Sequence, residues 1–303
     1  MPTAPAPNTL PYGVAPPGFR LPSATTVGPV TLQVADLARS VDYYERVLGL
    51  RVMRGSTDGV TLGTRDSSTA LVILRELKGA TPIPRRGRLG LYHFAILLPD
   101  RVALGAFVRH LSELKIYAGM SDHLVSEAIY LTDPDGLGIE VYADRPRREW
   151  RHEGRQLVMA TEPLDVEDLT RAAGAAGWTA MPEGTTMGHV HLYVGDLDAA
   201  AKFYHAGLGL DKVVWSYPGA LFLSAGGYHH HLGTNTWAAG ALPAGDTDAR
   251  LLEWEIRLPA EDDVEAALES LRATGATVEA TGGGGRGALA RDPWGTAVRV
   301  RVK

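Results

Sequence analysis

The sequence has no cysteine among its 303 residues. Disulfides, thiolate metal ligands and thiol nucleophiles are therefore excluded, and any metal ion must be held by nitrogen and oxygen atoms. Runs of like charge are also missing, because 30 basic residues are balanced by 35 acidic ones for a net charge of -5. This balance gives no field that would gather nucleic acid or an anionic membrane, so we expect a small-molecule partner.

Long apolar segments are missing as well. No stretch reaches the roughly 18 uncharged apolar residues of a membrane span, and the start of the chain lacks a cationic segment followed by an apolar one. We therefore expect a cytoplasmic protein. The apolar content of 45% is enough for a sizeable core in two domains, preceded by a proline- and alanine-rich arm.

The chain repeats itself. VGPVTLQVADLARSVDYYERVLGL, starting at position 27, matches MGHVHLYVGDLDAAAKFYHAGLGL, starting at position 187, with Asp36 aligned to Asp196 and Tyr44 to Tyr204. Each copy predicts a strand, a turn at the aspartate and an amphipathic helix of about eleven residues that ends at a glycine.

A second pair of repeats follows the same plan. LYHFAILLPDRVALGAFVRHL and LLEWEIRLPAEDDVEAALESL each predict a strand and a helix, and each precedes an Asp-Pro-X-Gly turn, at Asp133 and Asp292. Short β-rich runs complete each copy, so we predict four βαβββ units in an α+β fold. The glycine run 282–285 is expected to be a hairpin loop. The predicted organisation is an arm (1–25), units one and two (26–146), a linker (147–186) and units three and four (187–303).

Four βαβββ units over residues 27–303 resemble the vicinal oxygen chelate superfamily, which includes glyoxalase I, bleomycin-binding proteins and extradiol dioxygenases. The resemblance implies that pairs of units form two cup-shaped open barrels, the glyoxalase-like fold. It also implies that metal ligands come from the first and last strands of a unit. In units one to four, the first-strand positions hold Pro29, His93, His189 and Glu253, and the last-strand positions hold approximately Val72, Glu140, His231 and Arg299.

Only units two and three are equipped for a metal. His93, His189 and Glu140 supply the two imidazoles and one carboxylate that suit an oxygen-activating iron(II) site. Units two and three should then share one cup, nested inside units one and four. Sequential pairing would instead place the Arg299 cation beside a metal, which electrostatics disfavours, unless Arg299 simply pairs with Glu253.

Unit two carries a more specific signature, DHLVSEAIYLTDPDGLGIEVYAD. It resembles the terminal metal-binding unit of extradiol dioxygenases, in which an Asp-His-x-Val-Ser run is followed by a tyrosine ten residues before the glutamate ligand. Here these residues are Tyr130 and Glu140. With LYHFAILLPDR, DRPRREW and AGGYHHHLGTNTW, the chain most resembles bacterial catechol 2,3-dioxygenase-like proteins.

The resemblance implies an oxidoreductase of aromatic compound catabolism in which iron(II) chelates a catechol or hydroquinone and O2 opens the ring. Fe(II) is the expected metal, with Mn(II) and Zn(II) as alternatives, and no organic cofactor is expected. His123 would be the acid/base group for the substrate hydroxyl, and Tyr130 would hydrogen-bond the chelated oxygen. His231, or its neighbours His229 and His230, would be a fourth ligand or an outer group.

Two other functions stay open. A glyoxalase-like lyase or isomerase would use Zn, Ni or Mn as a Lewis acid, and a non-catalytic drug-binding protein would hold a ligand in the cup without turnover. Oxygen consumption separates the first of these from a dioxygenase. The aromatic substrate cannot be named from the sequence, and a homo-oligomer is only a family expectation.

Overall fold

The structure is a computed structural model, and it describes residues 12–57, 59–65, 69–280 and 287–303. The predicted hairpin loop at 282–285 and the first part of the predicted arm lie outside these residues. Across the described part of the chain, no helix has the length and apolar character needed to cross a membrane.

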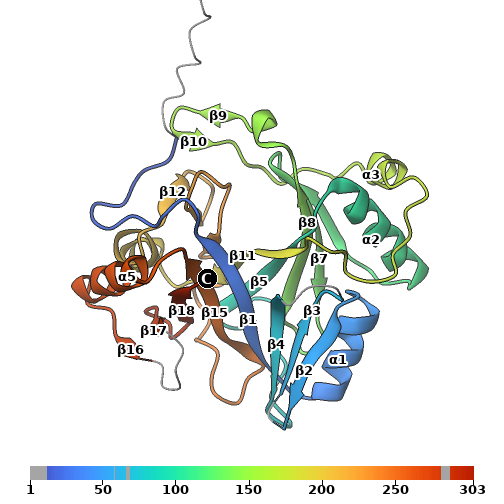
Figure 1. The fold of residues 1–303 in the computed structure, drawn as a ribbon, viewed down its shortest axis with the longest axis horizontal. Helices are drawn as coiled ribbons and strands as arrows, with labels where there is room; N and C mark the ends of the chain where they lie inside the picture. Colours follow the sequence, from blue (N-terminus) through green and yellow to red (C-terminus); the bar gives the residue numbers. More distant parts are fainter. Residues whose placement is uncertain (1–11, 58, 66–68, 281–286) are drawn as a thin grey trace, which may run out of the picture.

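Four βαβββ units are present, as predicted (Figure 1). Unit one consists of β1 (Thr26–Val34), α1 (Leu37–Arg46), β2 (Arg51–Ser56), β3 (Gly59–Gly63) and β4 (Ala70–Glu76). Unit two consists of β5 (Gly90–Leu97), α2 (Arg101–Glu113), β6 (Gly119–Asp122), β7 (Ser126–Thr132) and β8 (Gly138–Asp144).

The second half of the chain repeats this plan. Unit three consists of β11 (Thr186–Tyr193), α4 (Leu197–Ala200) continued by the π-helical turn η2 (Ala201–Gly207), β12 (Asp211–Val214), β13 (Ala220–Ser224) and β14 (Leu232–Asn235). Unit four consists of β15 (Arg250–Leu258), α5 (Glu261–Ala273), β16 (Val278–Ala280), β17 (Gly287–Arg291) and β18 (Ala297–Val302). The linker holds the 3₁₀ turn η1 (Arg147–Glu149), β9 (His152–Glu153), β10 (Gln156–Leu157) and α3 (Val166–Ala172).

The aspartates aligned by the repeat begin their helices as expected. The side chain of Asp36 accepts a hydrogen bond from the backbone N–H of Arg39, and Asp196 does the same for Ala199. After α1 the chain turns at Gly49, whose φ of +73° lies in the left-handed region. A Cβ there would also lie 2.7 Å from the backbone nitrogen of Met181, so this position needs glycine.

Units two and three pair in one sheet, and units one and four pair in the other. One sheet has the order β12-β13-β14-β11-β5-β8-β7-β6 and joins units three and two, while the other has the order β16-β17-β18-β15-β1-β4-β3-β2 and joins units four and one. The prediction that units two and three share one cup is therefore confirmed. The sheets contact each other where β1 meets β11 and where β15 meets β5, near the centre of Figure 1.

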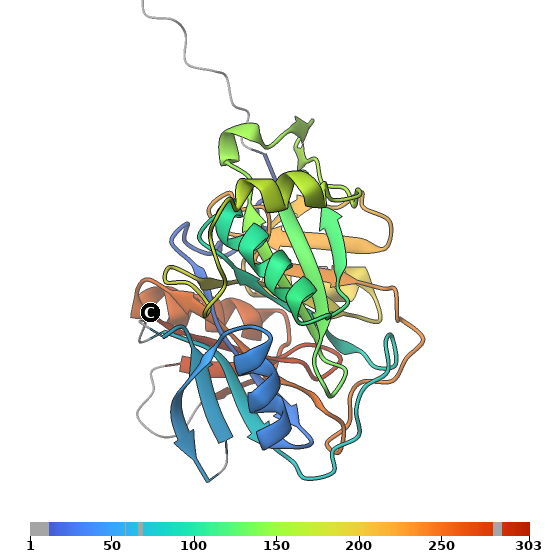
Figure 2. The ribbon, with the colours of Figure 1, turned by 90° about the vertical axis from the view of Figure 1, so that its right-hand side faces the viewer.

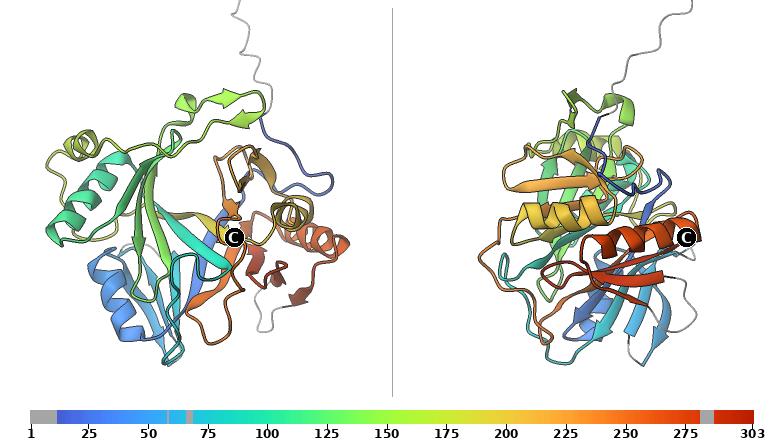
Figure 3. Two further views of the ribbon diagram at one scale, coloured as in Figure 1. Left: turned by 180° about the vertical axis from the view of Figure 1, so that it is seen from behind. Right: turned by 90° about the vertical axis from the view of Figure 1, so that its left-hand side faces the viewer.

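The helices pack within each half of the chain, although the sheets pair across the halves. Tyr44 of α1 stacks on Phe94 of β5 and donates to Asp133 of unit two at 3.2 Å. Tyr204 of unit three donates to Asp292 of unit four at 2.9 Å. Figures 2 and 3 show α1 and α2 on one flank and α4 and α5 on the other. The division into domains at 26–146 and 187–303 stays a prediction, because each sheet takes one unit from either half.

Asp133 and Asp292 are turn residues, as the sequence indicated. Asp133 accepts hydrogen bonds from the backbone N–H groups of Asp135 and Leu137, both at 2.9 Å. Asp292 accepts from the backbone of Trp294 and Thr296 in the matching turn of unit four. Each carboxyl thus closes the turn before the last strand of its unit.

The described part of the N-terminal arm packs along unit three and the linker. Arg20 makes two hydrogen bonds to Asp211, at 2.8 and 2.7 Å, and Val14 pairs with Lys212 in an isolated bridge. The Arg155 guanidinium of the linker donates to the carbonyl of Gly13.

Candidate metal centre

Three side chains converge on the concave face of the sheet shared by units two and three. His93 lies on β5, Glu140 on β8 and His189 on β11. The strand register explains the convergence: Ala95 of β5 pairs with His189 on one side and with Glu140 on the other, and His93 precedes Ala95 by two residues on the same face. These are the residues that the sequence proposed as ligands.

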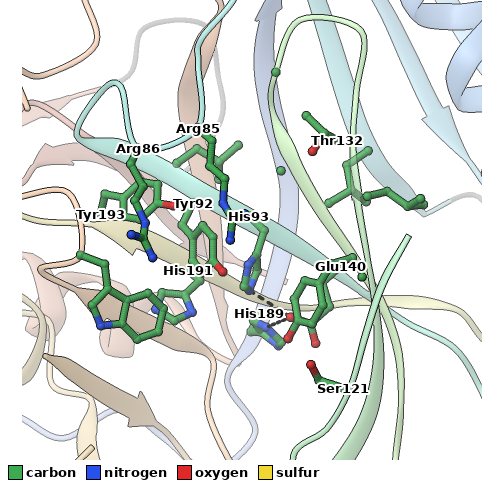
Figure 4. A pocket seen from close by; sticks show the side chains of 18 of the residues that line it. Arg85, Arg86, Tyr92, His93, Ser121, Thr132, Glu140, His189, His191 and Tyr193 are labelled. Carbon is green, nitrogen blue, oxygen red and sulfur yellow. Dashed lines mark hydrogen bonds and ion pairs between the residues drawn. The ribbon is translucent and has the colours of Figure 1, made fainter. Parts of the chain in front are cut away.

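The group is tight and buried. His93 Nε2 and His189 Nε2 lie 3.0 and 3.3 Å from the same atom, Glu140 Oε2 (Figure 4). Burial alone would raise the pKa of Glu140, but the imidazoles of His189 and His93 hold it well below its usual range. Burial lowers the pKa of His189 to about 4, so at neutral pH this ring is neutral and offers a lone pair.

The donor set fits a divalent metal ion. Ligands with metal bonds of about 2.1 Å on adjacent corners of an octahedron lie about 3.0 Å apart, close to the two distances in this group. The ligand atoms all lie within 4.8 Å of one another. Glu140 Oε2 has one hydrogen bond within the group, from His189 Nε2 at 3.3 Å, whereas His93 Nδ1, His93 Nε2 and His189 Nδ1 are buried without a hydrogen-bond partner. Hydrogen bonding within the protein therefore leaves most of the ring nitrogens of the group unsatisfied.

A cavity of about 1010 Å³ opens over this group. One wall is aromatic, and another comes from β6, β7 and the linker. The aromatic wall consists of Tyr92, Tyr193, Tyr217, Phe222 and Trp237. Binding cavities for drug-sized ligands span roughly 300–1,000 Å³, so there is room for considerably more than one aromatic ring.

His123 and Tyr130, the two predicted catalytic residues, form a hydrogen-bonded pair in this cavity. Tyr130 is the cross-strand partner of Glu140, and its hydroxyl lies 2.5 Å from His123 Nε2. His123 Nδ1 lies 2.7 Å from the carbonyl oxygen of Ala160, which can only accept. Nδ1 therefore carries the hydrogen, and Tyr130 donates to Nε2. Burial, together with the Glu140 charge, raises the pKa of Tyr130 well above its ordinary value, so the phenol stays protonated.

Comparison with known proteins identifies the family of this chain. The model of the glyoxalase/bleomycin resistance protein/dioxygenase superfamily matches residues 26–141 and 186–300. The chain belongs to this superfamily. Catechol-2,3-dioxygenase of Bacillus subtilis (strain 168) is 43% identical to it over 261 residues, which cover 85% of this chain and 91% of that protein.

Two solved structures show the same superfamily fold. A protein of Bacillus subtilis subsp. subtilis str. 168, provisionally named a dioxygenase, superposes with a TM-score of 0.63 at 14% identity, covering 94% of this chain and 86% of its own. Glyoxalase I of Zea mays superposes with a TM-score of 0.56 at 18% identity, covering 92% of each chain.

The strand register shows that His231 is not the last-strand residue of unit three that is equivalent to Glu140. In unit two, Glu140 lies opposite Ala95, which is two residues after His93. In unit three, the residue two after His189 is His191, and it lies opposite Gly233. Gly233 is therefore the residue equivalent to Glu140. The structure does not bring His231 into the metal group. Its Nδ1 accepts from the backbone N–H of Ala225, and burial lowers its pKa to about 3.

Gly233 leaves space for a neighbouring ring. A Cβ at this position would lie 2.8 Å from the ring of His191, which is buried and lines the cavity. His191 Nε2 lies 2.9 Å from the side-chain nitrogen of Asn235, which can only donate to it. Sequence reasoning did not single out His191 as a cavity residue.

The other cup holds an ion pair at the equivalent positions. Arg299 makes two hydrogen bonds to Glu253, at 2.8 and 2.5 Å, as the sequence suggested. In unit one, Pro29 offers no ligand, and Ile73 rather than Val72 lies opposite Thr31, two residues after Pro29. Within the described residues, His93, Glu140 and His189 are the group that could hold a metal.

His230, which the sequence named beside His231 and His229 as a possible fourth ligand or outer group, lines the cavity. Its ring centroid lies 4.0 Å from that of His189. His229 Nε2 lies 2.8 Å from Asp144 Oδ1, and His229 Nδ1 lies 2.7 Å from His230 Nδ1. If His229 donates to the carboxylate, its Nδ1 accepts from His230, and Nε2 of His230 is left as a hydrogen-bond acceptor. The three consecutive histidines lie in a loop before β14, so strand alternation could not assign them.

Proposed function

We propose that this chain is an extradiol ring-cleaving dioxygenase that holds iron(II) through His93, Glu140 and His189 and opens a catechol or hydroquinone ring with O2. The observation that carries the proposal is the buried His-Glu-His group in a large, aromatic-walled cavity. Its occurrence in a chain 43% identical to a catechol-2,3-dioxygenase supports ring cleavage over other chemistry of the superfamily.

His93, Glu140 and His189 would hold the iron(II), which would supply binding of a diol and O2 and would favour loss of the diol protons near neutral pH. Mn(II) would accept the same ligands. Zn(II) would also bind, but it has no redox chemistry, so it suits the lyase or isomerase alternative.

The protein groups around the metal set would manage protons and orientation. Tyr130, one strand from Glu140, can donate a hydrogen bond to a diol oxygen when it turns from His123. His123 then takes or returns a proton at Nε2, while the Ala160 carbonyl holds its Nδ1–H in place. On the opposite side, His230 can accept a hydrogen bond from a substrate hydroxyl.

The first experiment is oxygen uptake by anaerobically iron(II)-loaded protein, with a panel of catechols and hydroquinones and with product absorbance followed in parallel. His93→Ala is the control. Uptake that depends on His93 is the expected result. Full metal loading without oxygen uptake for any diol would reject ring cleavage and favour the lyase or isomerase alternative.

Tyr130→Phe is expected to lower kcat by on the order of 10-fold to 100-fold, the effect of losing a hydrogen bond to a charged or reacting group. Iron content should stay at the wild-type level, because the phenol is not among the proposed ligands. Steady-state oxygen uptake and metal analysis measure the two effects. Tyr12→Phe is the matched control, since it removes a phenol that donates to the carbonyl of Gly227 and is not among the residues that line the cavity. Equal losses of kcat in both variants would contradict the role of Tyr130.

A further inference from the structure

The charged residues of the cavity are unbalanced. Apart from histidines, the charged side chains that line it are Arg46, Arg85, Arg86, Arg88 and Glu140. The carboxylate belongs to the proposed metal set, so the rest of the lining is cationic in a chain whose net charge is -5. A cavity with this lining favours an anionic ligand.

Two of these arginines already have carboxylate partners. Arg88 donates to Asp248 at 2.7 Å, and Arg46 lies 3.5 Å from Asp42 on the same helix. No ion pair joins Arg85 or Arg86 to a carboxylate anywhere in the described ranges. These two guanidinium groups are therefore the cations of the cavity wall that can take a ligand's negative charge.

The loop that carries the pair is a defined turn. The backbone N–H of Gly87 donates to the carbonyl of Pro84 at 2.8 Å, and Arg86 has a φ of +58°. This left-handed conformation favours glycine or asparagine in a turn and disfavours a long side chain by roughly 1 kcal/mol. Within the described residues, no ion pair with a carboxylate offsets this conformational cost at Arg86.

The pair lines the same cavity as the metal group. In Figure 4, Arg85 and Arg86 extend into the cavity beside Tyr92 and Tyr193, while Glu140 lies beyond His93. Burial raises the pKa of Tyr193 to about 12, and the Arg86 and Arg85 guanidinium groups oppose that rise at close range. The Tyr92 hydroxyl is within electrostatic range of both arginines and of Glu140.

We propose that Arg85 and Arg86 form a subsite for a carboxylate on a flexible arm of the aromatic diol, so that the preferred substrate is a catechol with an anionic side chain. The inference rests on the proposed ring-cleaving function. A guanidinium presents paired donors that match a carboxylate, and Tyr92 and Tyr193 would flank the arm between the two ends. A cavity of about 1010 Å³ leaves room for such an arm.

The test compares dihydrocaffeate, a catechol whose two-carbon arm ends in a carboxylate, with its methyl ester. Affinity is measured by calorimetry on the iron(II)-loaded full chain without oxygen, and kcat/KM by oxygen uptake. The variant is Arg85→Gln with Arg86→Asn, because asparagine tolerates the left-handed turn. Its matched control is Arg54→Gln with Arg75→Gln, which removes the same charge from exposed positions on the other sheet.

We expect wild-type protein to prefer the acid over the ester by about tenfold or more in both measurements, about 1.4 kcal/mol. The preference should fall toward unity in R85Q/R86N, persist in R54Q/R75Q, and weaken as salt rises to about 1 M. Equal affinities in wild-type protein, or a preference that survives R85Q/R86N, would overturn the subsite while leaving ring cleavage standing. Absence of oxygen uptake with any diol, dihydrocaffeate included, beside an intact preference in anaerobic binding, would reject ring cleavage and keep the anion site.

Discussion

Glu140→Gln is expected to abolish iron(II) binding and, with it, oxygen uptake. Glu140 is the carboxylate on which both imidazoles converge, and its pKa is held well below the usual range, so the ligand is anionic at any working pH. Glutamine keeps the shape and loses the charge. Loss of an outer partner of a metal ligand already costs 10- to 100-fold in affinity, so loss of the ligand charge should weaken binding by on the order of 100-fold or more.

The effect is measured by metal analysis and by the rise in melting temperature on adding iron(II) without oxygen. A ligand at about 100 times its Kd stabilises a protein by about 2.7 kcal/mol, and this stabilisation should be lost in the variant. The metal-free variant should fold, because glutamine removes a buried charge and adds no bulk. Glu253→Gln is the matched control, because Glu253 is a carboxylate of the other cup, at the first-strand position that His93 holds in unit two. Its iron content should equal that of wild-type protein. Full iron loading of Glu140→Gln would contradict the proposed site.

The sequence predicted this site because the repeat supplied internal comparisons. A histidine at one strand position is weak evidence, but His93 and His189 occupy the same position in two copies, while Pro29 and Glu253 occupy it in the others. Nested pairing followed from the ligand set, because His93, Glu140 and His189 belong to units two and three, and the charge of Arg299 disfavoured the sequential alternative. The structure agrees, since Arg299 pairs with Glu253 in the sheet of units one and four.

The residues that the sequence missed lie where the chain leaves the repeat. β14 begins at Leu232, so the three histidines before it belong to a loop, and counting along the sequence could not locate Gly233 as the position equivalent to Glu140. Arg85 and Arg86 lie in the connection between β4 and β5. Strand register fixes side chains within sheets, whereas loop residues are positioned by tertiary contacts that periodicity does not encode.

The turn aspartates should make the protein less stable as the pH rises. Burial raises the pKa of Asp133 from 3.8 to about 7 and that of Asp292 from 3.8 to about 6, although backbone N–H groups favour the ionised form. The folded state therefore binds these protons more tightly than the unfolded state does. The stabilisation is present in full below about pH 4 and is lost as the pH rises through the folded pKa values. The largest loss of folding free energy that these pKa shifts allow is about 4 kcal/mol for Asp133 and about 3 kcal/mol for Asp292.

Asp133→Asn with Asp292→Asn should remove this dependence, because an asparagine oxygen can still accept from the turn and its amide can meet the Tyr44 or Tyr204 hydroxyl. Thermal melts between about pH 5 and about pH 8 measure the difference between variant and wild-type protein, with about 2–4 °C expected per kcal/mol. Asp36→Asn with Asp196→Asn is the matched control, since both residues are exposed helix caps where asparagine serves equally well. Tyr44 and Tyr204 each join two units of one half of the chain through their contacts with the turn aspartates. If the melting temperatures of wild-type protein and of the Asp133/Asp292 variant fall in parallel as the pH rises, these contacts carry no proton linkage. If the melting temperature of the variant rises relative to that of wild-type protein as the pH increases, the proton linkage lies at the contacts that hold each half together.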